Sequence, residues 1–308
     1  MTQNLQAFLF GAGFGVRLRP LTDTRPKVAV PVMGKPVIFH AIEQLAGIGI
    51  KKMVINRHYK GDVLEGMAGD GEQWNVEIRY STEKDILETG GGLKYAEPLI
   101  SSQTFIAYNG DILCDIDLRD AIAFHRQHKA MVTLITAPWC APRQLTLDAN
   151  NRIIDIRKSI YKSSVPTHTF LGIHILEREI FSYMEHGKYS IIKTYLSLIK
   201  DGAPVFAYDM PRGYWYDIGS IEQYKLAHKM LCAQTAFSNA TSCLSVMDKS
   251  ACQRGYVSLG ERVVIEEDVY MEDVIVWDDV TIKKGACLKD VIVRDGLTVE
   301  GTFENDIL

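Results

Sequence analysis

The chain has 308 residues, of which 47% are hydrophobic and 23% are charged, and its formal net charge is -4 at pH 7. This composition is that of an ordinary globular protein, and the length suits two domains or one large domain with an appendage. The small negative charge excludes a general electrostatic affinity for nucleic acid or for an anionic membrane surface. No apolar run approaches the roughly 20 residues of a membrane-spanning helix. Six cysteines without C-x-x-C spacing indicate reduced thiols, so we expect a cytoplasmic protein.

Short apolar runs alternate with helical patterns through the first two thirds of the chain. Apolar runs predict strands at 5–10, 51–56, 104–113, 130–137 and 169–176. Apolar residues at helical spacing predict helices at 37–50, 118–130 and 221–232. Strands that alternate with helices form a mostly parallel sheet with helices on both faces. The predicted fold class of this part is therefore α/β and Rossmann-like.

The composition and the hydrophobic pattern of the sequence change after the last predicted helix. A stretch rich in Ser, Ala and Thr predicts a linker, which we place at 234–254. Beyond it, MEDVIVWDDVTIKKGA (271–286) and LKDVIVRDGLTVEGT (288–302) align at a spacing of 17 residues. Single apolar residues that recur every five or six positions favour a short parallel β-helix at 255–308. An antiparallel meander with coincidental similarity is the alternative.

The most informative stretch is LFGAGFGVRLRPLTDTRPKVAVPVMGKP (9–36), which follows the first predicted strand. Glycines in this position usually bring backbone N–H groups close to phosphate. The dinucleotide fingerprint G-x-G-x-x-G fails because Val16 stands at its third glycine, and no P-loop lysine is present. Arg17, Arg19 and Lys27 lie instead on a segment stiffened by prolines, which loses little freedom when it closes on a ligand. As a set they predict a polyphosphate site, and a plain turn with solvated charges is the alternative.

This stretch resembles the signature of the sugar-1-phosphate nucleotidyltransferases. Further motifs of that family follow in the same order, namely ETGGGL (88–93), NGDI (109–112), FLGIHIL (170–176) and WYDIGS (215–220). The central part is similar to N-acetylmuramate-1-phosphate uridylyltransferases. The repeats resemble the left-handed β-helix appended to mannose-1-phosphate guanylyltransferases. The resemblance thus implies a catalytic domain at 1–233, the linker, and a left-handed β-helix at 255–308.

The resemblance also implies a reaction and its catalytic groups. The nucleoside monophosphate of UTP or GTP would pass to a sugar 1-phosphate, and pyrophosphate would leave. Arg17 would hold the departing phosphates, and Lys27 would stabilise charge at the α-phosphate. Asp111 ends an apolar strand, where sites of parallel sheets open, and a carboxylate there suits Mg²⁺. Taken alone, Asp217 is better explained as a helix cap or surface acid, but in this family the two acids meet across the metal, which favours a metal ligand.

Two sets of binding residues follow from the same resemblance. Nucleotide contacts are implied at Gly11, Ala12, Gly13, Gly15, Glu83, Thr89 and Gly90. Sugar-phosphate contacts are implied at Asn109, Lys158, Thr169 and Gly172, with Arg157 as the alternative to Lys158. Consecutive glycines at 90–92 would let the backbone pass close to ribose and base, and Glu83 would accept a hydrogen bond from a base unless it is simply exposed. Asn56 either reaches the sugar or serves the turn at the end of its strand.

Two other classes of protein compete with this reading. A catalytically silent regulatory subunit would bind a nucleotide sugar, but the cations and acids whose loss would favour it are all present. An acyltransferase is suggested by the β-helix, but no histidine lies within the repeats to act as a base. We expect a homo-oligomer in which the short β-helix packs against another subunit or caps the catalytic domain. The sugar and the base, uridine or guanosine, stay open.

Overall fold

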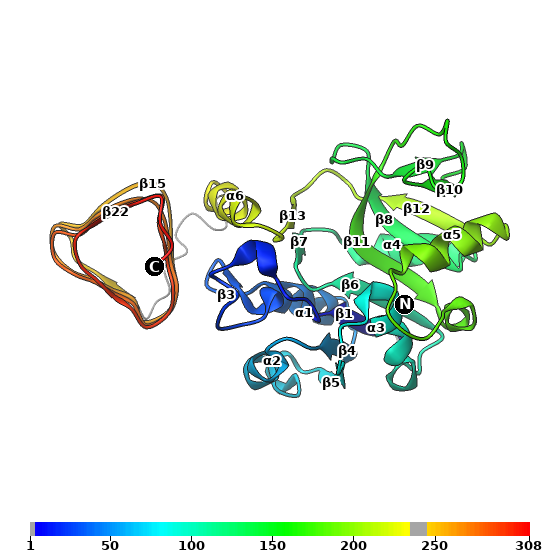
Figure 1. Cartoon of the computed structure of the whole chain (residues 1–308), viewed down its shortest axis with the longest axis horizontal. Helices are drawn as coiled ribbons and strands as arrows, with labels where there is room; N and C mark the ends of the chain where they lie inside the picture. Colours follow the sequence, from blue (N-terminus) through cyan, green and yellow to red (C-terminus); the bar gives the residue numbers. More distant parts are fainter. Residues whose placement is uncertain (1–3, 235–244) are drawn as a thin grey trace. The chain divides into compact units, whose positions relative to one another are not determined.

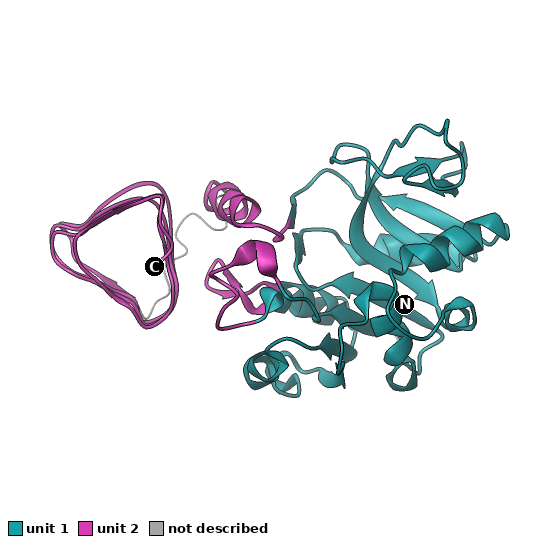
Figure 2. Ribbon diagram, viewed as in Figure 1, with its two compact units in different colours: residues 1–14, 26–28, 38–216 teal, residues 15–25, 29–37, 217–308 magenta. Residues whose placement is uncertain are grey.

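The computed structural model describes residues 4–234 and 245–308, and its elements follow one another as in Figure 1. The chain folds into two compact units, drawn in different colours in Figure 2. Unit 1 comprises residues 1–14, 26–28 and 38–216, and unit 2 comprises residues 15–25, 29–37 and 217–308. Across the described ranges, no helix combines the length and the apolar character needed to span a bilayer.

Unit 1 is built on a seven-stranded sheet with the strand order β12-β8-β11-β6-β1-β4-β5. The strands are β1 (Gln6–Phe10), β4 (Lys52–Arg57), β5 (Glu77–Thr82), β6 (Thr104–Asn109), β8 (Val132–Ala137), β11 (Thr169–Glu177) and β12 (Val205–Asp209). Neighbours pair in parallel except at β11, which runs antiparallel to β6 and β8. The predicted mostly parallel sheet is confirmed. The run predicted at 104–113 divides into β6 and β7 (Ile112–Cys114).

Helices cover both faces of this sheet, as predicted. Successive residues of a strand point to opposite faces, and in β1 Ala7 and Leu9 join one hydrophobic cluster whereas Phe8 joins the other. The first cluster contains apolar residues of α1 (Val37–Gly47), α2 (Gly61–Ala68) and α4 (Leu118–Gln127). The second contains those of α3 (Glu88–Tyr95) and α5 (Ile192–Lys200). The sheet therefore has a core on each side, and its strand ends are left to form a site.

Shorter elements connect the strands. They are η1 (Val16–Leu18), η2 (Lys27–Ala29), β2 (Pro31–Val32), β3 (Lys35–Pro36), η3 (Glu72–Trp74), η4 (Glu97–Leu99), β9 (Leu145–Leu147), β10 (Ile153–Ile156), η5 (Arg178–Tyr183) and β13 (Trp215–Asp217). The strands β9 and β10 pair as an antiparallel hairpin, and so do β2 and β3.

Unit 2 contains α6 (Ile221–Cys232), whose bounds are those predicted. Its N-cap is Ser220, whose hydroxyl accepts a hydrogen bond from the Gln223 backbone N–H, as helix starts require. The strands that follow are β14 (Val246–Met247), β15 (Cys252–Leu259), β16 (Val264–Ile265), β17 (Tyr270–Val276), β18 (Thr281–Ile282), β19 (Cys287–Lys289), β20 (Ile292–Val293), β21 (Thr298–Val299) and β22 (Thr302–Glu304).

These short strands form the predicted parallel β-helix. Ile275 lies opposite Ile292, and Thr281 lies opposite Thr298, so the 17-residue repeat is one coil. The coils enclose a single apolar core and are triangular in Figure 1. Because every pairing between coils is parallel, the antiparallel meander is excluded. The left-handed sense of the coils stays a prediction.

Part of the range predicted as a linker, 234–254, forms strands in the structure. Residues 235–244 lie outside the described residues. The strand β14 and the start of β15 fall within the rest of that range. Val246 pairs with Val264 of the next coil, so pairing between coils starts where the sequence is still rich in small polar residues.

Candidate active site

The glycine-rich turn begins where β1 ends. The Gly11 N–H donates to Asn56 Oδ1 over 2.7 Å, and the Ala12 N–H lies 3.4 Å from the same oxygen. A Cβ at Gly11 would lie 2.6 Å from the backbone oxygen of Asn56, so only glycine fits this close approach. Asn56 stands in β4, beside β1 in the sheet, and its side chain is 2% exposed. Of the two roles considered for Asn56, the structure supports the turn.

Glu83 holds Asn56 in this position. Asn56 Nδ2 donates to Glu83 Oε1 over 2.6 Å, and the Leu87 N–H donates to Glu83 Oε2 over 2.9 Å. Glu83 is 3% exposed, and burial raises the pKa of its carboxyl group while the bonds from Leu87 and Asn56 lower it. Both oxygens thus accept hydrogen bonds from the chain itself, and the expected bond from a nucleotide base stays a prediction. The role of Glu83 is to position Asn56.

The motif ETGGGL lies within the helix α3, so its glycines are not in a loop. A Cβ at Gly90 would lie 2.5 Å from the ring of Tyr189, and one at Gly92 would lie 2.5 Å from Glu83 Oε1. The hydroxyl oxygen of Thr89 accepts a hydrogen bond from the Ile191 N–H over 3.0 Å. Packing inside the protein is therefore sufficient to explain why these positions carry glycine.

Lys27 and Asp111 form an ion pair between Lys27 Nζ and Asp111 Oδ2. Asp111 follows β6, which pairs with β1, and both side chains are partly buried. The preceding Gly110 donates its N–H to the backbone oxygen of Phe10 over 3.0 Å, and a Cβ there would lie 2.7 Å from that oxygen. The predicted catalytic cation and the predicted metal ligand are thus together, and Asp111 is held next to the end of β1.

Two of the predicted sugar-phosphate residues also lie together. Gly172 has a φ of +82°, and a Cβ at this position would lie 2.8 Å from Asn109 Nδ2. Glycine is therefore needed at 172 for both its conformation and its neighbour. Asn109 ends β6, two residues before Asp111.

Thr169 and Lys158 are placed differently. Thr169 is buried, and its hydroxyl lies 2.9 Å from the Cys140 carbonyl oxygen and 3.0 Å from that of Pro142, so its contact with the sugar phosphate stays a prediction. Lys158 is exposed in the loop that folds around the Asp155 carboxylate. Burial raises the pKa of Asp155, but hydrogen bonds from that loop outweigh it and keep the pKa low.

Arg17 and Asp217 come together within unit 2. A Cβ at Gly219 would lie 2.9 Å from Asp217 Oδ1 and 3.2 Å from a guanidinium nitrogen of Arg17. Gly15, which precedes η1, has a φ of 62° and accepts a hydrogen bond from the Thr22 hydroxyl over 2.9 Å. The segment that carries Arg17 is thus folded around a glycine in the left-handed region. Because Asp111 belongs to unit 1 and Asp217 to unit 2, their pairing across a metal stays a prediction.

The available donors fit a hard cation. Within residues 4–234 and 245–308, no three His, Cys, Asp or Glu side chains gather into a metal cluster. Mg²⁺ is usually held by one or two carboxylates together with substrate phosphates. The carboxylates of Asp111 and Asp217 are of the type that Mg²⁺ prefers, and their joint binding of the metal stays a prediction.

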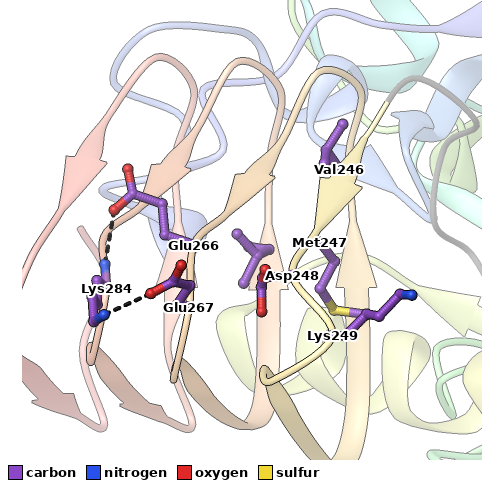
Figure 3. Close-up of a pocket in the computed structure, with 8 residues that line it drawn as sticks. Val246, Met247, Asp248, Lys249, Glu266, Glu267 and Lys284 are labelled. Carbon is purple, nitrogen blue, oxygen red and sulfur yellow. Dashed lines mark hydrogen bonds and ion pairs between the residues drawn. The ribbon is translucent and has the colours of Figure 1, made fainter.

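A pocket on the β-helix contains none of the predicted site residues (Figure 3). Lys284 Nζ lies 2.6 Å from Glu267, and the Lys284 N–H donates to Glu266 over 3.0 Å. Glu266 is also paired with Lys283. The side chains of Glu266, Glu267 and Lys284 in this pocket are therefore all engaged in hydrogen bonds or ion pairs with the chain itself.

Comparison with known proteins agrees with these motifs. Residues 6–234 match the family model described as nucleotidyl transferase. A mannose-1-phosphate guanylyltransferase of Mycobacterium tuberculosis is 27% identical over 94% of this chain and 84% of its own length. A UTP–glucose-1-phosphate uridylyltransferase of Synechocystis is 30% identical over 71% of this chain and 61% of its own length. A Bacillus anthracis protein provisionally assigned as a glucose-1-phosphate thymidylyltransferase has the same fold, with a TM-score of 0.66 at 19% identity over 76% of this chain and 99% of its own.

The chain belongs to the nucleotidyl transferase family. The match covers the whole sheet and its helices, and the relative from Mycobacterium tuberculosis extends the similarity over most of the β-helix as well. The resemblance found in the motifs is confirmed.

Proposed function

We propose that this nucleotidyltransferase transfers the nucleoside monophosphate of UTP or GTP to a sugar 1-phosphate and releases pyrophosphate. The observation that carries the proposal is the Lys27–Asp111 pair beside the glycine-rich turn at the strand ends. The named activities of the two relatives, guanylyl transfer to mannose 1-phosphate and uridylyl transfer to glucose 1-phosphate, support it. The silent regulatory alternative has no comparable support, since these relatives are named as transferases.

The reaction needs charge neutralisation rather than a protein nucleophile. An oxygen of the sugar phosphate attacks the α-phosphorus, and a new P–O bond forms there. The bond from the α-phosphorus to the bridging oxygen breaks, and its electron pair leaves with pyrophosphate. Two anions must be brought together in line, so positioned cations supply most of the catalysis.

The residues divide this work as follows. Lys27 stabilises charge on the α-phosphate, and Arg17 binds the two phosphates that leave. The Gly11 and Ala12 N–H groups serve Asn56, so we assign the nucleotide to the side of the turn at Gly13, where a Cβ would meet only open space. Asn109 and Gly172 border the sugar phosphate. Asp111 and Asp217 would hold Mg²⁺, which, when bound, neutralises charge on the phosphate oxygens. A cytoplasmic location and a homo-oligomer stay predictions.

A substrate panel tests this proposal. Each of the four nucleoside triphosphates is combined with mannose, glucose, heptose and N-acetylmuramate 1-phosphates, and pyrophosphate release is measured with Mg²⁺. We expect release that needs both substrates and occurs with UTP or GTP. A purified, folded chain that releases no pyrophosphate with any pair would contradict the proposal.

The role of Asp111 is tested by Asp111→Asn. Loss of a group that holds charge in the site should reduce turnover by at least ~100-fold. The matched control is Asp201→Asn, which makes the same change at an exposed position after α5 and should leave turnover unchanged. Near-normal turnover of Asp111→Asn with Mg²⁺ would refute the assignment.

A further inference from the structure

The segment that carries Arg17 is in contact with the β-helix inside unit 2. Arg25, eight residues after Arg17, places its guanidinium carbon 4.5 Å from the centre of the Trp277 ring and forms an ion pair with Asp295. Trp277 follows β17, and Asp295 follows β20 on the adjacent coil. The Arg25 side chain is 16% exposed and that of Trp277 is 2% exposed. An arginine so enclosed is held in one orientation, since its planar group both stacks and pairs.

A second connection runs through α6 to Pro31, a few residues beyond this segment. The Trp277 Nε1–H donates to the hydroxyl oxygen of Tyr224 over 2.9 Å, and the Tyr224 hydroxyl donates to the backbone oxygen of Pro31 over 2.7 Å. Tyr224 is fully buried. Trp277 therefore contacts Arg25 directly and is linked to Pro31 through Tyr224, so one β-helix residue is connected both to residues 15–25 and to the chain that follows them.

Arg25 lies in the chain between two cations to which the proposed function gives a role. Arg17 precedes Arg25 in the chain, and Lys27 follows it by two residues. A loop that is already ordered loses less conformational entropy when it binds a ligand, and its affinity is higher for that reason. Loosening Arg25 would leave the chemistry of Arg17 unchanged but would reduce the fraction of molecules in which the segment is ready to bind.

We propose that Arg25 is a positioning residue through which the β-helix holds residues 15–25 ready for the triphosphate, so that nucleotide affinity depends on Asp295 and Trp277. This inference rests on the proposed function and deepens it. It assigns the β-helix a role within its own chain, one that the expected packing between subunits does not require.

The test compares two Asp→Asn variants of the β-helix. Asp295→Asn weakens the ion pair with Arg25. Asp279→Asn makes the same change in an exposed ion pair, that of Arg262 with Asp279. We expect Asp295→Asn to raise the KM for the nucleoside triphosphate about 10-fold, on the scale of one charge-assisted hydrogen bond. The KM for the sugar 1-phosphate should not change, and the control variant should match the wild type in both.

Hydrogen exchange supplies a readout that needs no substrate. Amides of residues 15–25 should exchange faster in Asp295→Asn than in Asp279→Asn or the wild type. Equal exchange and equal nucleotide KM in the two variants would overturn the inference. If the wild type fails the pyrophosphate assay while exchange in 15–25 rises, the proposed function falls and the structural role of Asp295 stands, so the two failures are distinguishable.

Further variants test the same contact if Asp295→Asn does not fold. Trp277→Phe keeps an aromatic ring under Arg25 but removes the donor to Tyr224, and it should raise the nucleotide KM as well. The reversed pair, Arg25→Asp with Asp295→Arg, should recover nucleotide affinity relative to Asp295→Arg alone. A reversed pair no better than the single variant would contradict the role of this contact.

Discussion

The support of the glycine-rich turn by two buried polar side chains yields a sharp prediction for Asn56→Asp. Asn56 donates to Glu83 through Nδ2 and accepts from the Gly11 N–H through Oδ1. Aspartate keeps an acceptor for Gly11 but replaces the donor by a second carboxylate oxygen against Glu83. Two buried carboxylates at hydrogen-bond distance cannot both be ionised, so the pair must keep one proton.

The expected loss of stability in Asn56→Asp follows from the free energy needed to keep that proton bound. Burial already raises the pKa of Glu83, and the second carboxylate raises the pKa of the pair further. A carboxyl group with a raised pKa in the folded protein stabilises it most below its unfolded value near 4.3, and the contribution is lost as the pH rises toward the folded value. Each pH unit in this interval costs about 1.4 kcal/mol. We expect Asn56→Asp to be about 3 kcal/mol less stable than the wild type at pH 7, with a smaller difference at pH 5.

Urea unfolding between pH 5 and pH 8 measures this difference. Asn150→Asp is the control, because it makes the same change at an exposed turn residue, where a new charge has little effect on stability. We also expect reduced nucleotide affinity for Asn56→Asp, since the turn loses its support. The reasoning would be refuted if the loss of stability in Asn56→Asp did not change between pH 5 and pH 8 and was as small as the loss in Asn150→Asp.

Two further predictions concern buried positions. Gly92→Ala should lower both stability and activity, because its Cβ would lie 2.5 Å from Glu83 Oε1. The control Gly66→Ala, on α2 with nothing within 4 Å, should instead stabilise the chain by about 0.5–1 kcal/mol; equal effects of the two in thermal unfolding would count against the packing argument. Burial lowers the pKa of His174 to about 3. Below pH 6.5 this histidine is therefore protonated in the unfolded chain but stays neutral in the folded protein. The stability advantage of the wild type over His174→Asn should therefore shrink by about 1.4 kcal/mol per pH unit below 6.5, and parallel unfolding curves at pH 7.5 and pH 5 would contradict this.

Five strands of the main sheet were predictable from local pattern, and so was the ion pair's placement of Lys27 and Asp111 near the glycine-rich turn. Apolar runs identify β1, β4, β6, β8 and β11 because each central strand is buried on both faces. The helix α3 was not predicted, since three consecutive glycines argue against a helix. Its glycines are explained by the side chains that press against it, among them Tyr189 and Glu83. The support of the turn by Asn56 was left open because its partner Glu83 stands on a different strand end.

The sequence by itself determined the parallel sheet, the cations behind the glycine-rich turn and the 17-residue coil of the β-helix. Each of these features can be recognised from the spacing of residues along the chain, because side chains alternate or recur with the period of the helix, strand or coil that carries them. Only the tertiary structure decided that Glu83 is buried against Asn56 and that Arg25 is paired with Asp295. Such contacts join residues far apart in the chain, 270 positions apart in the second case. They produce no periodic pattern in the local sequence, so the sequence alone does not predict them.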